Sequence, residues 1–460
     1  MEDSANLERS IEVYAKLRGL LNSLPPETCG KVMAFLEQLH STGQSFPGYD
    51  MIVSELAVIK ASRPAHMRRT GPLQRQFFAP LEAFLIDEVL PEKRIARIER
   101  ASLTPIWNWM SRDVLGEAMN DFELKGDLGG LIEAIMPTLR ETVGAPQDLA
   151  LRRTIAQMGG ARVFEDLRDM VVVLQNQEAL KAVSDRIVGP IGQVDEHHAR
   201  FMTAALTPFA RANSPLMPYA VAMMLPKLSV PWQIIRVAIF ACESDSGPQI
   251  AQTPYRAVVE LMLADIERLM IRAEQARSSH NDELLATATG DFAVYVKTLL
   301  TEIELLPEQL WSRRLSALRA RMARLLAPDL EGLPGRIRAL LRARPLEHSG
   351  RKAAIDEHER ASIEAYLNIL MVARSSASEL ALNEVTMRVF NEVQAYLDAG
   401  LPPLIEGVRG LGGEDRAHRL LQLDAAVKVA YRVRGPIFAT LLAKSIDVAS
   451  NEKRPIARSA

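Results

Sequence analysis

The chain has 460 residues, of which 48% are hydrophobic and 24% are charged, and its formal net charge at pH 7 is -2. This balance excludes disorder over most of the length, because there is ample apolar surface to bury. The small net charge also excludes binding of a polyanion by bulk charge, so any affinity for anions must come from local patches.

Cysteine content and long apolar runs both bear on where in the cell a protein is located. Cys29 and Cys242 are the only cysteines and lie too far apart in sequence for a disulfide framework or a cysteine-rich metal site. Residues 1–16 carry acids where a signal peptide would carry basic residues. No run approaches the roughly 18 apolar residues of a membrane span. We therefore expect a cytoplasmic protein with no transmembrane segment.

Helical periodicity dominates the first part of the chain. Apolar residues recur at steps of three and four over 11–21 and 32–39, which predicts two helices. Residues 41–50 are rich in Gly, Ser and Pro and predict a loop. A short helix over 51–61 then leads into residues 62–71, an irregular and basic segment.

An aromatic and proline-rich stretch, residues 73–122, is the expected centre of the N-terminal body. Aromatic side chains bury more area than others, so such a cluster marks a place where elements pack. We predict one central helix over 106–122, with Trp107 in the core. Trp109 lies off the face of Trp107, so it either fills a second interface or stands exposed as an anchor for a partner.

The helical pattern continues through the middle of the chain. Residues 170–174 have the sequence MVVVL, whose valines would suit a buried strand, but no partner strand is evident and a helix is preferred. Because proline is tolerated in the first helical turn, we interpret each Leu-Pro dipeptide as a helix start. These dipeptides begin at Leu24, Leu90, Leu225, Leu306, Leu333 and Leu401. Their spacings share no period, so a regular helical repeat is not supported.

Long uninterrupted patterns fill the C-terminal half. Neither Gly nor Pro occurs over 255–289 or over 351–399, and the serine-rich residues 375–378 predict a break in the second of these stretches. Residues 401–413 predict a connector, and residues 451–460 a flexible tail.

The predicted fold is therefore all-α with two main parts. A compact multi-helix body over residues 1–250, centred on 73–122, precedes a bundle of long helices over residues 251–450.

Residues that carry chemistry are sparse. Asp195 and His198, spaced i, i+3, are the one candidate metal pair in which the histidine falls on an apolar face. The alternative, which we prefer, is a histidine in the first turn of a helix whose N-cap is Asp195. No phosphate-binding loop, nucleophile elbow or zinc-protease motif is present. We predict no catalytic residue and no cofactor.

Two arginine-rich patches are the strongest functional signal. One leads into the aromatic stretch, and the other is an amphipathic helix that begins at Trp311. Such a helix can lie on an anionic membrane, bind nucleic acid or bind a protein partner. Alternatively, its arginines pair with acids of neighbouring helices, such as Glu302 and Glu359. The candidate anion-binding or partner-binding residues are Arg63, Arg68, Arg69, Arg75, Arg313, Arg314, Arg321, Arg324, Arg336 and Arg338.

Three functions remain open from the sequence. The first is a non-catalytic helical scaffold or adaptor that binds a protein partner or a second copy of the chain. The second is a peripheral protein that binds an anionic membrane or nucleic acid through the arginine patches. The third is an enzyme or small-molecule sensor with a pocket between helices.

Overall fold

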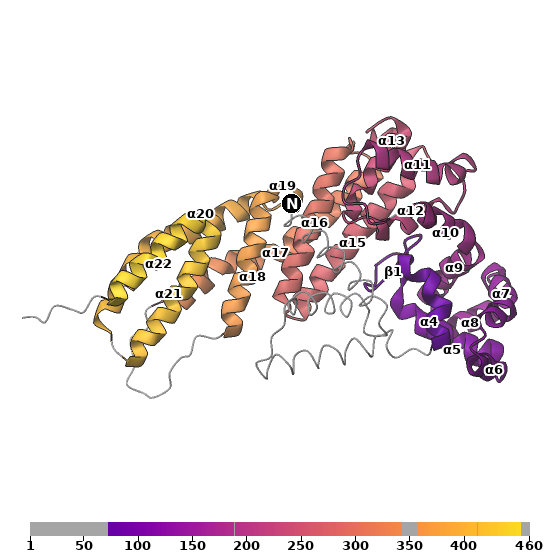
Figure 1. Ribbon diagram of the computed structural model, residues 1–460, viewed down its shortest axis with the longest axis horizontal. Coiled ribbons are helices and arrows are strands. Elements are labelled where there is room, and N and C mark those ends of the chain that lie inside the picture. The colour runs from indigo at the N-terminus through magenta and orange to yellow at the C-terminus, as the bar shows by residue number, and fades with distance from the viewer. Residues whose placement is uncertain (1–71, 188, 343–356, 412, 452–460) are drawn as a thin grey trace, which may run out of the picture. The chain divides into compact units, whose positions relative to one another are not determined.

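The computed structural model describes residues 72–187, 189–342, 357–411 and 413–451, and this part of the chain is almost entirely helical (Figure 1). The all-α prediction is confirmed. Among the described residues, two very short strands, β1 (Leu85–Ile86) and β2 (Ile98–Glu99), pair in parallel. The helices predicted before residue 72, and all but the first residue of the predicted tail, lie outside the described residues.

Most of the described helices are joined by short connections. The first half contains α4 (Pro72–Phe78), α5 (Leu103–Trp109), α6 (Ala118–Lys125), α7 (Leu128–Gly144), α8 (Leu149–Met158), α9 (Ala161–Gln175), α10 (Gln177–Arg186), α11 (Glu196–Arg211), α12 (Met217–Met224) and α13 (Ile235–Cys242). The second half contains α14 (Gly247–Ala251), α15 (Arg256–Ser278), α16 (Asp282–Glu302), α17 (Leu310–Leu341), α18 (Glu357–Ser375), α19 (Ala377–Leu380), α20 (Asn383–Glu406), α21 (Gly413–Arg434) and α22 (Pro436–Asn451).

The chain divides into two units by its internal contacts. The first comprises residues 1–79 and 116–134, and the second comprises residues 80–115 and 135–460. In the described part of the first unit, α6 ends at Gly126 in the left-handed conformation, and the Asp127 carboxylate accepts a hydrogen bond from the Gly130 amide in the first turn of α7. The second unit contains both strands and all the helices from α8 onward.

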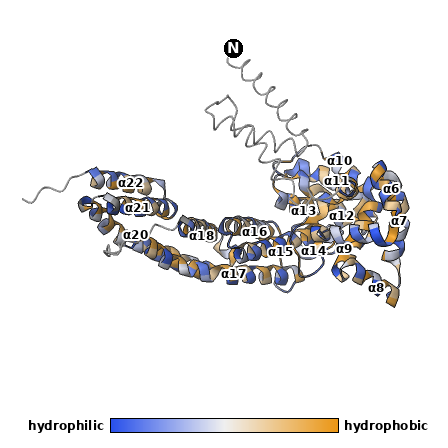
Figure 2. Ribbon diagram, turned by 90° about the horizontal axis from the view of Figure 1, so that it is seen from below, coloured by the Kyte–Doolittle hydropathy of each residue, from blue (hydrophilic) through white to orange (hydrophobic). Residues whose placement is uncertain are grey.

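Within the second unit the long helices pack side by side. Figure 1 shows α15 beside α16, and α17 then packs on α15, α18 on α16, and α20 on α17. The hairpin of α21 and α22 continues this order against α20. Orange and blue alternate along α17 in Figure 2, as expected for an amphipathic helix with one buried face.

Helix α15 occupies the centre of the second unit. It contacts α12 and α13 on the N-terminal side and α16 and α17 on the other, and it is buried around most of its circumference. Asp265 and Glu267 are therefore buried together with the apolar residues. These contacts reach both ways from α15, and the division of the chain into two parts at residue 250 stays a prediction.

The predicted central helix over 106–122 is wrong in its continuity. Helix α5 passes into a π turn over Met110–Leu115, and Gly116 then takes a φ of +54° before α6 begins. A positive φ cannot be accommodated inside an α-helix, and glycine adopts it without steric cost. Trp107 is buried as predicted.

The interpretation of Leu-Pro as a helix start is wrong at three of the described dipeptides. Leu90-Pro91 lies in the loop between β1 and β2, where no helix begins. Leu333-Pro334 lies inside α17, and Leu401-Pro402 lies inside α20, so the predicted connector begins several residues later. Proline removes one helical hydrogen bond and commonly kinks the helix, but tertiary contacts can offset this cost. Leu333, Pro334, Leu401 and the next apolar residue, Leu404, are all buried, which supplies such contacts.

Two other predictions are confirmed. Residues 170–174 belong to α9, and the serine-rich residues 375–378 separate α18 from α19. None of the helices in the described ranges has the length and apolar character that crossing a membrane requires.

The left-handed turn at Gly116 makes a stability prediction. A Cβ added there would meet no neighbouring atom, so Gly116→Ala tests the backbone conformation alone. We expect a loss of about 1 kcal/mol in the free energy of unfolding, measured by urea denaturation. The matched control is Gly332→Ala in α17, where a Cβ also meets nothing. There we expect a gain of about 0.5–1 kcal/mol, because alanine favours the helix. Equal effects at both positions would contradict the assignment.

Candidate functional site

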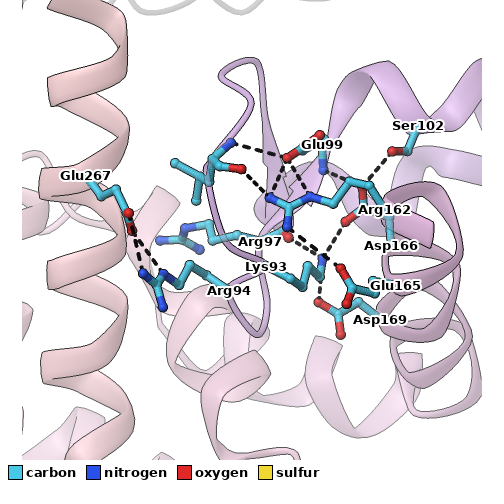
Figure 3. A network of polar contacts seen from close by, with 11 residues as sticks. Lys93, Arg94, Arg97, Glu99, Ser102, Arg162, Glu165, Asp166, Asp169 and Glu267 are labelled. Carbon is cyan, nitrogen blue, oxygen red and sulfur yellow. Dashed lines mark hydrogen bonds and ion pairs between the residues drawn. The ribbon is translucent and has the colours of Figure 1, made fainter. Parts of the chain in front are cut away.

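A network of ion pairs is buried around the loop that joins β1 to β2. The loop, residues 87–97, projects Lys93, Arg94 and Arg97 between α9 on one side and α15 on the other (Figure 3). The acids that receive these cations come from both helices. We call the three cations and their partners the loop network.

Lys93 connects the loop to α9. Its ammonium contacts the Asp166 carboxylate, lies 3.0 Å from Asp169 Oδ2 and donates to the Arg97 carbonyl at 2.5 Å. Asp166 is fully buried and also accepts hydrogen bonds from Ser102 Oγ at 2.6 Å and from the Glu99 amide at 3.3 Å. Two hydrogen bonds, to Asp166 and to the Arg97 carbonyl, and the ion pair with Asp169 therefore hold this ammonium in the interior.

Asp169 is the titratable group of this part of the network. The Tyr219 hydroxyl of α12 donates to its Oδ1 at 2.6 Å. Burial raises the pKa of Asp169 above its usual value, although the hydrogen bond from Tyr219 and the charge of Lys93 oppose the shift. Burial, together with the charge of Asp169, raises the pKa of Tyr219 well above its ordinary range, so this hydroxyl remains a donor.

Arg97 connects the loop to α15 by a fork. Its Nε and Nη2 donate to Asp265 Oδ1 at 3.1 and 3.0 Å, and Nη2 donates to Oδ2 at 2.9 Å, with both side chains buried. The preceding residue, Ala96, is buried and has a φ of +58°, which is unfavourable for a residue with a Cβ. The loop therefore keeps a strained turn at the residue before the one that delivers this guanidinium.

Arg94 extends the network to α17. It donates to Glu267 at 2.9 Å through Nε, and Arg314 of α17 donates to the same carboxylate at 2.8 Å. Arg314 also reaches Glu260 at 3.2 Å, and Glu260 accepts a hydrogen bond from the Trp311 indole at 2.5 Å. One continuous chain of charge pairs thus runs from the loop through α15 to α17.

A second acid of the loop region anchors the strand that follows it. Glu99 of β2 accepts from Arg162 Nε and Nη2 at 2.8 and 2.6 Å and from the Leu90 amide at 3.3 Å. Arg162 Nη2 also donates to the Leu90 carbonyl at 2.8 Å. These bonds fix the beginning of the loop against α9.

A cavity of about 540 Å³, which we call the loop cavity, opens beside this network. Its walls come from the loop, from the turn between α11 and α12, and from the first turns of α15. The lining residues are Lys93, Arg94, Ile95, Asn213, Ser214, Pro215, Met217, Pro218, Pro254, Arg256, Ala257, Glu260 and Leu261. Seven of these residues are apolar, and the other six are polar or charged.

The charges that line the loop cavity differ in how far they are neutralised. Lys93 is engaged by Asp166, by Asp169 and by the Arg97 carbonyl, and Glu260 is engaged by Trp311 and Arg314. Arg256, at the exposed start of α15, makes no ion pair with any residue in the described ranges.

An open groove of about 530 Å³ lies between the end of α20 and the outer face of α22, and we call it the C-terminal groove. It is lined by Pro402, Ile405, Glu406, Arg409, Leu441, Lys444, Ser445 and Val448. Helix α22 buries Ala439, Leu442, Ile446 and Ala449 on its other side, so it is apolar on two faces. On the outer face, the exposed fractions are 78% for Ile437, 59% for Leu441 and 54% for Val448.

The arginines predicted as a binding patch on α17 are mostly engaged within the fold. Arg314 pairs as described above, and Arg321 forms a fork with Glu274 at 2.6 and 2.5 Å. Arg336 forms a fork with Glu359, one of the acids named from the sequence, and Arg338 reaches Glu392 at 2.9 Å. Arg313 and Arg324 are exposed and pair with no described residue.

The other predicted residues fall into two groups. Arg63, Arg68 and Arg69 lie outside the described residues, and Arg75 is partly buried in α4. Trp109 is 4% exposed, which removes the alternative of an exposed indole as a partner anchor and favours the second interface. The physical reason is the tight succession of α5 and the π turn, where Trp109 and Met110 are buried together.

The acid–histidine pair of α11 has the capping geometry that the sequence favoured. Asp195 is the N-cap, and its Oδ1 accepts from the His198 amide at 2.9 Å and lies 2.6 Å from His198 Nδ1. These bonds to His198 lower the pKa of Asp195. His197 brings a third ligand atom within 4.8 Å of the other two, but the cluster is exposed or half-exposed. It remains a candidate metal site of low burial.

Sequence reasoning did not find the loop network. The signal was present as charged residues inside apolar stretches: Asp265 and Glu267 within α15, and the basic residues of the segment PEKRIARIER. A charge at a core position of a predicted helix indicates a buried partner, because an unpaired buried charge is costly. The partner itself lies about 170 residues away and carries no local signal.

Comparison with protein-family models, with curated proteins and with solved structures gives no match.

A second prediction concerns the bidentate ion pair between Arg97 and Asp265. Asp265→Leu leaves Arg97 buried and unpaired, and we expect a loss of about 3–5 kcal/mol in the free energy of unfolding by urea denaturation. The double variant Arg97→Met with Asp265→Leu removes both charges, so most of that loss should be recovered. A double variant as unstable as the single one would show that the ion pair is not the source of the loss.

The raised pKa of Asp169 makes a third prediction, on pH dependence. A carboxyl whose pKa is higher in the folded than in the unfolded state binds more protons when folded. Its contribution to stability therefore decreases as the pH rises through the interval above its ordinary pKa of 3.8. We expect the stability of the wild type, measured relative to Asp169→Asn by urea denaturation, to fall across that interval. A difference that stays constant or grows with pH would contradict the shift.

Proposed function

We propose that this chain is a non-catalytic helical scaffold that binds a protein partner through the C-terminal groove. The observation that supports it is the outer face of α22, where Ile437, Leu441 and Val448 form an exposed apolar stripe at helical spacing. Isolated exposed apolar residues are common, but a stripe along a groove is typical of a site for another protein. The proposal includes a cytoplasmic location.

The chemistry of the groove favours an amphipathic helix as its occupant. Leu441 and Val448 lie on one side of the groove, and Pro402 and Ile405 lie on the other. Apolar side chains on both sides suit a bound helix that has apolar residues at positions i, i+4 and i+7. Glu406 is paired with Arg409 at 3.3 Å. Lys444 is exposed and pairs with no described residue, so the partner helix should carry an acidic residue beside its apolar stripe.

The arginines of α17 give less support to an anionic membrane or nucleic acid as partner. Four of the six predicted there form ion pairs within the fold, which reduces the free positive charge of the helix. Non-specific binding of a polyanion depends on unpaired cations that replace counterions. Arg313 and Arg324 alone, on the described face of α17, are few for that role.

The groove can be tested with a library of helical peptides displayed on phage, selected against the full chain. We expect enriched peptides to carry an apolar i, i+4, i+7 pattern with an acidic neighbour. Leu441→Glu should weaken their binding about tenfold or more, because burying a leucine contributes about 1.5–3 kcal/mol. The matched control is Leu421→Glu on α21, an exposed leucine (50%, against 59% for Leu441) that does not line the groove.

Two outcomes would overturn the proposal. One is that no peptide prefers the wild type over Leu441→Glu, or that Leu421→Glu causes the same loss. The other is that the wild type sediments as a dimer and Leu441→Glu as a monomer, since a second copy of the chain would then be the occupant.

A further inference from the structure

We infer that the loop cavity is a binding site for a small organic anion with an apolar body. This inference is independent of the C-terminal groove, because the two sites share no residue. It assigns the site to a ligand of the chemical class of a medium-chain carboxylate or an aromatic sulfonate.

The size and lining of the cavity specify the apolar body. A volume of about 540 Å³ is within the range of sites for small molecules, about 300–1,000 Å³. Met217 and Leu261 are buried at the wall, and Ile95 is 60% exposed on the loop at the wall. Three prolines and Ala257 add rigid apolar surface without side-chain entropy to lose on binding. A fully polar ligand would leave these groups without a counterpart.

The charged residues in the lining of the loop cavity favour a ligand with an anionic head group. Arg256 lines the cavity and has no acidic partner among the described residues, so its guanidinium is free to donate to a ligand. Arg94 is fixed by Glu267, but its Nη1 is engaged only by Glu92, whose side chain is 73% exposed. A ligand carboxylate can replace this solvated partner at small cost, because exposed ion pairs contribute little. Arg94 and Arg256 both line the cavity, and a guanidinium can donate two parallel hydrogen bonds to one carboxylate or sulfonate.

The wall of the cavity is preorganised by the loop network. Lys93 and Arg94 are held from behind by acids of α9 and α15, and Glu260, the acid of the lining, is engaged by Trp311 and Arg314. An anion entering the cavity therefore meets a neutralised acid and an unpaired cation. Groups fixed before binding lose little entropy on binding.

The test uses the full chain and the probe 1-anilinonaphthalene-8-sulfonate, which has an apolar body and an anionic head, followed by fluorescence titration. It is carried out in the Leu441→Glu background, so that binding of the probe in the C-terminal groove is suppressed. We expect saturable binding that Arg256→Gln weakens about tenfold, because a hydrogen bond to a charged group contributes about 1.5–3 kcal/mol. The matched control is Arg313→Gln, an exposed and unpaired arginine outside the cavity, which should leave the affinity unchanged.

A competition arm tests the chemistry of the head. Decanoate should displace the probe, and decanol, with a chain of the same length, should displace it much less. The inference is overturned if the probe does not bind saturably, if Arg256→Gln binds it as the wild type does, or if decanol competes as well as decanoate. Arg256 is exposed, so its substitution leaves the core intact, and a thermal melt of each variant verifies that it is folded.

Discussion

Pairing of buried charge is the constraint on which the architecture around α15 depends. Asp265 and Glu267 lie in a helix that is buried around most of its circumference, and an unpaired carboxylate there would be prohibitively costly. Arg97 and Arg94 of the loop supply the opposite charges, and Lys93 does the same for α9. Buried ion pairs add little net stability compared with apolar residues of the same shape, but losing one partner is expensive. The loop network therefore chiefly determines the position of the loop. It also holds the strained turn at Ala96 in place.

The same constraint explains why the number of arginines in α17 overstates the unpaired positive charge on its surface. Arg314 shares Glu267 with Arg94, so one carboxylate joins the loop to α17. Arg321 and Arg336 find acids on α15 and α18 in the same way. A helix that looks strongly basic in the sequence is thus largely neutralised by its neighbours, and its arginines act between helices. The planar guanidinium suits this role, because it matches a carboxylate with two parallel hydrogen bonds.

Periodicity in the sequence predicted what depends on neighbours three or four residues apart. The helix over 161–175 and the break after Ser375 are of this kind, since local patterns determine them. The π turn before Gly116 and the prolines inside α17 and α20 depend instead on tertiary contacts that compensate for local cost. The loop network is harder to predict from the sequence, because Arg97 and Asp265 are 168 residues apart and Arg94 and Glu267 are 173 residues apart. A sequence shows that a buried charge needs a partner without showing which residue it is.

The two surfaces derived from the structure follow from different physical features of the same fold. At the C-terminal groove, α22 has one apolar face in the bundle and a second one outside, and no described residue covers Leu441 or Ile437 fully. At the loop cavity, the exposed Arg256, which has no acidic partner among the described residues, lines a space beside the loop network. The two have similar volumes, about 530 and 540 Å³, so the proposed occupants are distinguished by the lining: an exposed apolar stripe of α22 at the groove, and Arg256 beside fixed charges at the cavity. The two sites share no residue, so a substitution in the lining of one leaves the lining of the other unchanged.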